Sequence, residues 1–100
     1  MERLQNIHPG EVLMQEFLIP LDISAYRLSK EIHIPQTRIS EILKGRRRIT
    51  ADTALRLSAF FGNSEKFWLG LQNDFDIEQT RMQAIDELIK IQKIKTKDVA

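Results

Sequence analysis

The stretch that decides the fold is residues 24–45, SAYRLSKEIHIPQTRISEILKG. Its apolar residues recur at helical spacing in two short runs, separated by a break around His33. Ser24 is a suitable N-cap for the first run, because its hydroxyl can accept from free backbone N–H groups. Gly45 can end the second run in a left-handed conformation. The pattern predicts two short helices joined by a tight turn, a helix-turn-helix.

The second helix of this unit is expected to begin near Gln36 and run to Lys44, with Pro35 in its first turn. Burial of Ile39, Ile42 and Leu43 would leave its other face polar. That face would carry Gln36, Thr37, Arg38, Ser40, Glu41 and Lys44. Gln suits adenine, Arg suits guanine and Glu can accept from cytosine, so this is a candidate recognition helix for DNA bases. The alternative is a solvated helix face in an all-α protein.

Positive charge gathers beside this helix. Residues 36–48 contain five Lys or Arg residues and one acidic residue, a local charge of +4, although the whole chain carries only +1. Most of it lies in the basic loop, residues 44–48, KGRRR. Such a cluster is often only a solvated face, but next to a recognition helix it favours a nucleic-acid partner.

The rest of the chain is also expected to be helical. A first helix should run from Pro9 or Gly10 to just before Pro20, with the apolar residues around that break packed inward. These residues are Leu18, Ile19 and Leu21. The helix from Ser24 should bury Ala25, Leu28, Ser29 and Ile32.

Two further helices are expected to complete the core. Thr50 can cap one that ends at Gly62, with an apolar side made of Ala54, Leu55, Leu57, Ser58 and Phe61. Ser64 should begin the next, with core candidates Phe67, Trp68 and Leu71.

A last helix is expected to begin at Asp76, because Asp76 and Gln79 have the spacing of a capping box. One of its faces would carry Ile85, Leu88, Ile89 and Gln92, whereas residues 95–100 should fray. This face can pack on the core, form a dimer interface or receive another protein.

Composition excludes several classes of protein. The chain has 100 residues, 42% hydrophobic and 29% charged, which is typical of one small folded domain. It has no apolar run long enough for a membrane span and no signal peptide, so a cytoplasmic protein without a membrane partner is expected. The absence of cysteine excludes disulfides, thiolate zinc sites and thiol nucleophiles.

No residue set indicates catalysis or cofactor binding. His8 and His33 are the only histidines, too few for a zinc site without cysteine. No Ser/His/Asp set, phosphate loop or carboxylate pair is present, so we expect no enzyme, no catalytic residues, no metal and no cofactor. The aromatic residues are interpreted as core rather than a base-stacking surface: Phe60, Phe61, Phe67, Trp68 and Phe75. Tyr26 can either pack or donate to a phosphate.

Several linked motifs narrow the interpretation. They are HPGE at 8–11, PQTRISEILKGRRRIT at 35–50, TADTALRLSAFFG at 50–62 and FWLGLQNDFD at 67–76. In this order and spacing, from about His8 to Glu78, the chain resembles the HigA-type antitoxins, a branch of the Xre/phage-repressor helix-turn-helix family. The resemblance implies an all-α, five-helix repressor-like helix-turn-helix bundle at residues 1–75. An additional C-terminal helix and frayed tail, residues 76–100, would belong to the same compact unit.

The resemblance also implies a function. HigA-type antitoxins are small dimeric repressors that bind a palindromic operator upstream of their own operon. They also neutralise a RelE-like, mRNA-cleaving toxin, and the resemblance implies the same two roles here. Residues implied to contact base edges are Gln36, Thr37, Arg38, Ser40 and Glu41. Residues implied to contact phosphates are Ser24, Lys44, Arg46, Arg47 and Arg48, although one of the arginines could instead pair with a carboxylate. The partners implied are double-stranded operator DNA, a RelE-like toxin and a second copy of the chain.

The chain departs from the family pattern at two positions. Ala25 stands where a Gln is frequent, which removes one expected DNA contact. His33 stands where Gly is common, and it would be more costly than Gly if the turn requires positive φ. Two other roles stay open: a stand-alone repressor without a toxin, and a protein-interaction module that has lost DNA affinity.

Overall fold

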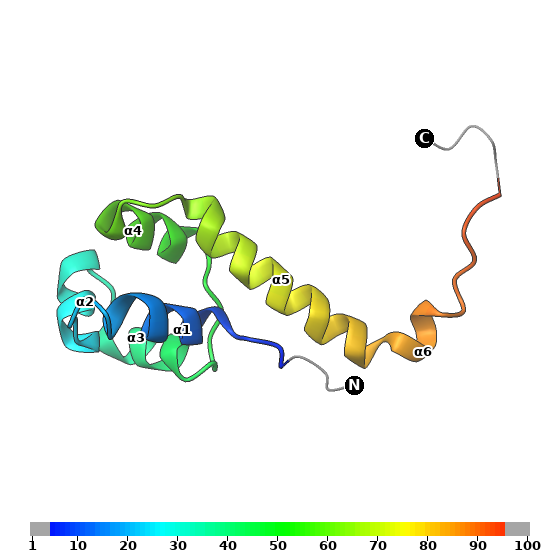
Figure 1. Ribbon diagram of the computed structural model, residues 1–100, viewed down its shortest axis with the longest axis horizontal. Coiled ribbons are helices and arrows are strands. Elements are labelled where there is room, and N and C mark those ends of the chain that lie inside the picture. Colours follow the sequence, from blue (N-terminus) through cyan, green and yellow to red (C-terminus); the bar gives the residue numbers. More distant parts are fainter. Residues whose placement is uncertain (1–4, 96–100) are drawn as a thin grey trace.

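Residues 5–95 are described by a computed structural model, and they form helices joined by turns, with no strand among them. The elements are α1 (Pro9–Val12), η1 (Leu13–Leu18), α2 (Ala25–Ile32), α3 (Gln36–Leu43), α4 (Ala51–Phe61), α5 (Glu65–Gln83) and α6 (Ile85–Leu88). The all-α prediction is confirmed for this range. Figure 1 shows α1 to α4 gathered at the N-terminal end of α5, while the rest of α5 leads away from them to α6.

The predicted helix starts are set by side-chain caps. Ser24, Thr50 and Ser64 each accept from a backbone N–H of the first turn, at 3.0, 3.4 and 2.9 Å. These caps satisfy donors that a helix start leaves without partners. At the other ends, His33 terminates α2 with φ 59° and Gly62 terminates α4 with φ 78°. The boundaries around the helix-turn-helix are therefore encoded locally, as predicted.

The first helix has the predicted extent but changes its winding. After α1 it continues as the π-helix η1, and the N–H of Ile19 donates to the carbonyl of Met14, five residues back, at 3.0 Å. Leu18 is buried, but Ile19 and Leu21 are 58% and 55% exposed, so their predicted inward packing is wrong. The chain turns over residues 19–22, beyond the edge of the core, which carries these two side chains into solvent.

One core joins the helices. Its fully buried members come from η1, α2, α3, α4 and α5: Leu13, Leu28, Ile39, Ile42, Ala54, Leu57 and Trp68. The indole N–H of Trp68 donates to the Asn63 side chain at 2.9 Å, so this buried donor is satisfied. Two predicted core positions are wrong, because Leu55 is 56% and Phe67 is 40% exposed. Helical periodicity finds the apolar face, but only contact with a neighbouring helix decides how much of it is covered.

The predicted helix start at Asp76 is also wrong. Asp76 lies inside α5, which continues to Gln83. Its carboxylate receives side-chain donors from Arg48 and Gln72, so it does not cap its own backbone. The predicted C-terminal face is carried by the short α6 and the residues after it, with Ile85, Leu88 and Ile89 at 48%, 43% and 73% exposed. Gln92 follows α6 outside any helix, and residues 96–100 of the predicted tail lie outside the described range.

We refer to residues 77–95 as the C-terminal arm. Figure 1 shows it extending from the bundle, and the overall extents of 54 × 32 × 23 Å are accordingly elongated. No helix in residues 5–95 has the length and apolar character needed to cross a bilayer.

Candidate nucleic-acid interface

Helix α3 presents one buried and one polar face, as its sequence predicts. Ile39 and Ile42 are fully buried, and Leu43 is half-buried. Gln36 and Thr37 are exposed in the first turn of α3, Ser40 and Glu41 are half-buried further along it, and Lys44 is exposed at its end. The structure therefore brings five of the predicted DNA-contacting residues to one helix and leaves its N-terminal turn open to solvent.

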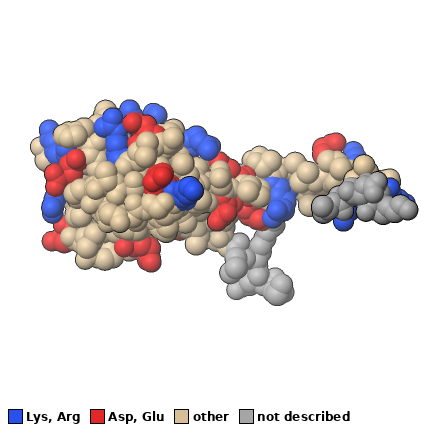
Figure 2. Space-filling view, turned by 90° about the horizontal axis from the view of Figure 1, so that it is seen from above, with Lys and Arg blue, Asp and Glu red and all other residues tan. Residues whose placement is uncertain are grey.

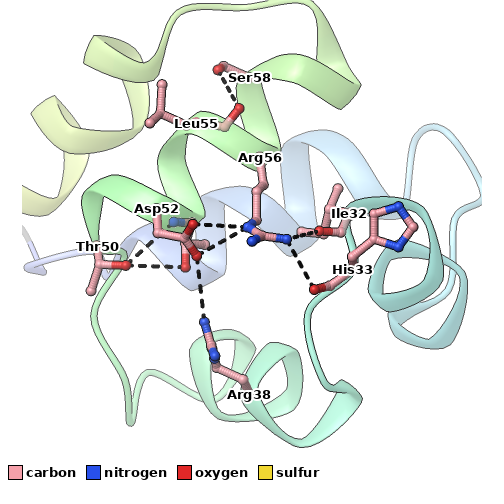
Figure 3. Close-up of polar contacts among 9 residues, drawn as sticks. Ile32, His33, Arg38, Thr50, Asp52, Leu55, Arg56 and Ser58 are labelled. Atoms are coloured by element: carbon pink, nitrogen blue, oxygen red, sulfur yellow. Dashed lines mark hydrogen bonds and ion pairs between the residues drawn. The ribbon is translucent and has the colours of Figure 1, made fainter.

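The turn between α2 and α3 is braced from both sides. His33 adopts a left-handed conformation with φ 59°, so the turn requires the positive φ that favours glycine. The Ser29 hydroxyl donates to the carbonyl of Ile34 at 2.7 Å. From α4, Arg56 donates to the carbonyls of Ile32 and His33 at 2.9 and 3.1 Å (Figure 3). These bonds satisfy carbonyls at the end of α2 and fix the angle at which α3 leaves it.

Arg56 was not among the predicted functional residues. Its only local signal is the i,i+4 spacing from Asp52, whose two carboxylate oxygens both lie 3.1 Å from its Nε. Spacing could predict that ion pair, but the contact with the turn joins residues 23 and 24 positions apart.

Arg38 points toward α4 and not along the outer face of α3. Its guanidinium lies 3.9 Å from the Asp52 carboxylate, and the side chain is 36% exposed (Figure 3). Asp52 thus joins Arg38 and Arg56, so α3 and α4 share one charged contact. The guanidinium of Arg38 is thus next to a carboxylate of α4, whereas Gln36 and Thr37 are exposed in the first turn of α3.

The arginines of the basic loop differ in their contacts. Arg47 pairs with Glu41 at 2.9 Å, and Arg48 pairs with Asp76 of α5 at 2.7 Å. Two arginines therefore have carboxylate partners, where the sequence suggested one. Arg46 and Lys44 are exposed and form no side-chain ion pair within residues 5–95. Because Arg47 lies against Glu41, it neutralises the one carboxylate on the outer face of α3.

The N-terminal end of α2 is also exposed. The Ser24 hydroxyl accepts from Arg27 N, which leaves its own hydrogen free to donate outward. Tyr26 is 57% exposed and does not pack in the core; Lys30 Nζ lies 5.3 Å from its ring centroid. Ala25 is half-buried next to them and offers no polar group.

His8 links the start of α1 to α5. Its Nδ1 accepts from Gly10 N at 2.9 Å, and its ring meets the Phe75 ring edge-on at 4.9 Å. Burial lowers the pKa of His8, although the nearby Asp76 carboxylate opposes that effect. The neutral ring keeps Nδ1 available as the cap of α1. In the described part of the chain, no group of three or more His, Cys, Asp or Glu side chains could hold a metal ion.

The aromatic residues are mostly interior. Trp68 is fully buried, Phe60, Phe61 and Phe75 are half-buried, and Phe17 joins them with its ring centroid 4.8 Å from that of Trp68. Figure 2, seen from above, shows Lys, Arg, Asp and Glu interspersed around a broad uncharged area of the bundle.

Comparison with known proteins places this geometry in a family. A helix-turn-helix profile matches residues 14–68. Virulence-associated protein I of Dichelobacter nodosus is 42% identical over 87 residues, 85% of this chain and 81% of that protein.

Two solved structures match nearly the whole chain. An addiction module antidote protein of the HigA family from Coxiella burnetii is 41% identical, with a TM-score of 0.85 over 92% of this chain and 100% of its own. The Pseudomonas aeruginosa antitoxin HigA, solved with the higBA promoter, is 30% identical, with a TM-score of 0.87 over 91% and 100%. The chain therefore belongs to the family of helix-turn-helix DNA-binding regulators that includes the HigA-type antitoxins.

Proposed function

We propose that the protein is a type II antitoxin that represses its own operon as a dimer and neutralises a RelE-like, mRNA-cleaving toxin. One observation above all supports DNA binding: α3 has an exposed, polar N-terminal turn and is followed directly by the basic loop. Gln36 and Thr37 approach base edges first, with Ser40 and Glu41 further along the same helix. Arg38 contributes to base contact after it leaves Asp52.

Phosphate contacts would come from both sides of α3. Ser24 donates from the start of α2, where the helix dipole and free N–H groups also favour an anion. Lys44 and Arg46 already face solvent, and Arg47 exchanges Glu41 for a phosphate. Arg48 stays bonded to Asp76 through one terminal nitrogen and reaches a phosphate with its other N–H groups. One α3 reads one half-site, and half-sites in successive major grooves lie about 34–36 Å apart, so a palindromic operator requires two copies.

The first test is binding to the DNA upstream of the protein's own gene, measured by fluorescence anisotropy over a range of salt concentrations. The proposal expects saturable binding with two-fold symmetric protection in a footprint. Affinity for unrelated DNA of the same length should be lower by at least about 10³-fold. Equal affinity for both DNAs at every salt concentration would show that the protein is not a sequence-specific regulator.

A Gln36→Ala variant tests base reading. Loss of a bidentate Gln–adenine contact should cost about 1–3 kcal/mol at one operator position and relax the choice of base there. The measurement is a panel of operators with single substitutions, assayed with the variant and with Gln15→Ala, an exposed glutamine on η1. The control should retain the wild-type preferences. If Gln36→Ala retains them too, the operator is not read through this residue.

Neutralisation of a toxin is supported by the family and by the shape of the chain. The C-terminal arm exposes apolar side chains that the bundle does not cover: Ile77, Met82, Ile85, Leu88, Ile89, Ile91 and Ile94. Such a surface is typical of a protein interface. We assign this arm to the toxin or to the second copy of the chain.

Co-expression with the product of the adjacent gene tests the toxin part of the proposal. A stable complex that suppresses mRNA cleavage is expected. Changing Ile85, Leu88 and Ile89 together to Ser should abolish this complex if the arm binds the toxin, and should dissociate the dimer if the arm binds the second copy. Asp86→Asn, an exposed neighbour in α6, is the control. Operator binding without any such complex would leave the stand-alone repressor as the function.

A further inference from the structure

The basic loop is held in place by α5, and the residues responsible lie outside the segment matched to the helix-turn-helix family. Gln72 is 2% exposed although it is polar. Its Oε1 accepts from the backbone N–H of Ile49 at 2.7 Å, and its Nε2 donates to Asp76 Oδ1 at 2.9 Å. One end of this buried amide therefore binds the residue that follows the basic loop, and the other end binds Asp76 within α5.

Asp76 extends this contact to the loop's side chains. Its second oxygen, Oδ2, accepts from Arg48 at 2.7 Å. Burial works to raise the pKa of Asp76, but hydrogen bonds from Gln72 and Arg48 and the charge of Arg48 outweigh it and hold the pKa below its ordinary value. The carboxylate is thus ionised at neutral pH, and it fixes Arg48 while Gln72 fixes the backbone of the next residue.

We propose that Gln72 and Asp76 are positioning residues for DNA binding: together they hold the Arg48–Ile49 segment so that the basic loop is ordered before DNA arrives. The inference rests on the proposed function, because it assumes that this loop contacts phosphates. A pre-ordered loop saves the entropy of fixing its backbone at the moment of binding. The contact made by Gln72 and Asp76 also links the loop to α5, the helix that leads into the C-terminal arm.

Removing the Asp76 carboxylate has opposite effects on DNA affinity under two interpretations of the Arg48–Asp76 pair. If the pair positions the loop, removing the carboxylate weakens DNA binding although the protein becomes more positive. If the pair only withholds Arg48 from DNA, removing the carboxylate frees a cation, tightens binding and steepens the salt dependence. The buried Gln72 favours positioning, because it holds the backbone and carries no charge.

The test compares Asp76→Asn with Asp74→Asn on the intact protein. Asp74 is an exposed carboxylate on the same helix and forms no ion pair with the loop within residues 5–95, so both variants change the charge equally. We expect Asp76→Asn to lower affinity for the protein's own promoter roughly tenfold, which is the scale of ordering one residue. Asp74→Asn should leave affinity unchanged or slightly raise it. Tighter binding by Asp76→Asn than by Asp74→Asn overturns the inference.

Gln72→Leu provides a second readout that needs no DNA. The side chain of Gln72 is the acceptor for the Ile49 N–H, so this amide should exchange with solvent much faster in the variant, by at least roughly tenfold. Affinity should fall while the slope of log K against log salt stays constant, because the number of cations is unchanged. Thermal melts set a temperature at which each variant is folded.

The outcomes separate the two proposals. An Ile49 amide that stays protected in Gln72→Leu, or unchanged promoter affinity in a folded variant with a fast-exchanging amide, overturns the positioning role alone. A wild-type protein that does not bind its promoter overturns the proposed function and this inference with it.

Discussion

Neutralising the basic loop as Arg46→Gln, Arg47→Gln and Arg48→Gln together should weaken binding to every DNA sequence by on the order of 10³–10⁴-fold at physiological salt. Each arginine that meets a phosphate releases condensed counterions, and a dimer doubles the number of such arginines. The slope of log K against log salt should become less steep by about 0.9 for each phosphate that is no longer neutralised. The measurement is anisotropy on promoter and unrelated DNA over a range of salt concentrations.

The three arginines should not contribute equally. Arg46 has no carboxylate partner in the described chain, so its contact with phosphate costs no existing ion pair. Arg47 must first leave Glu41, and Arg48 must share its guanidinium between a phosphate and Asp76, which reduces their net gain. These pairs are about half exposed, and such pairs are worth only about 0–1 kcal/mol, so the reduction is small. Among the single variants, Arg46→Gln should therefore lose the most affinity for DNA.

Lys66→Gln is the matched control for charge. Lys66 is exposed in the first turn of α5, which Figure 1 places on the opposite side of the bundle from α3. This variant should bind nearly as tightly as the wild type, with the same salt slope. A triple-arginine variant that keeps full affinity at all salt concentrations would show that the loop is not the phosphate clamp.

The helix-turn-helix was predictable because its signals are local. Ser24, His33 and Thr50 each set a helix boundary through bonds within a few residues, so sequence spacing is enough to place them. The same reasoning failed at Asp76. Its capping-box spacing is real, but a bond to Arg48, 28 residues away, takes the carboxylate. A local motif cannot reveal a competing partner that only the fold supplies.

The polar face of α3 was predictable for a similar reason, whereas the contacts of its arginines were not. Burial of Ile39 and Ile42 follows from helical period, and it determines which residues face outward. The direction of Arg38 depends on Asp52, and the bracing of the turn depends on Arg56; both come from α4. Exposure of Ile19, Leu55 and Phe67 likewise depends on where neighbouring helices end. Helical periodicity predicts which side of a helix is apolar, whereas contacts with other helices decide which side chains are covered or paired.

Gly10→Ala should be the most destabilising of the four Gly→Ala changes in this chain. Helix α1 crosses α3 so closely that a Cβ at Gly10 would lie 1.8 Å from the carbonyl oxygen of Ile42. Backbone atoms cannot rotate away as a side chain can, so one helix must move. Overpacking in a close-packed interior costs about 1–3 kcal/mol and occasionally more, and we expect at least the upper end of that range. The melting temperature should fall by roughly 12–24 °C.

Gly70→Ala is the matched control, because it adds the same methyl group to a helix. Gly70 lies within α5, and a Cβ there would meet no atom within 4 Å. Ala is favoured over Gly in a helix interior by about 1 kcal/mol, so this variant should melt roughly 4–8 °C higher than the wild type. Opposite shifts from one chemical change would assign the effect to the α1–α3 contact and exclude helix propensity as its cause. A Gly10→Ala protein that melts within a few degrees of wild type would mean that α1 can retreat at little cost.

The same contact joins stability to DNA reading. The Ile42 carbonyl that Gly10 approaches also accepts from Gly45 N at 3.0 Å, where α3 passes into the basic loop. A displaced carbonyl would therefore move the end of α3 and the start of the loop together. Folded Gly10→Ala protein, assayed well below its melting temperature, should bind the promoter more weakly than Gly70→Ala does. Such weaker binding would show that the close approach of α1 determines the position of α3 in addition to the stability of the bundle.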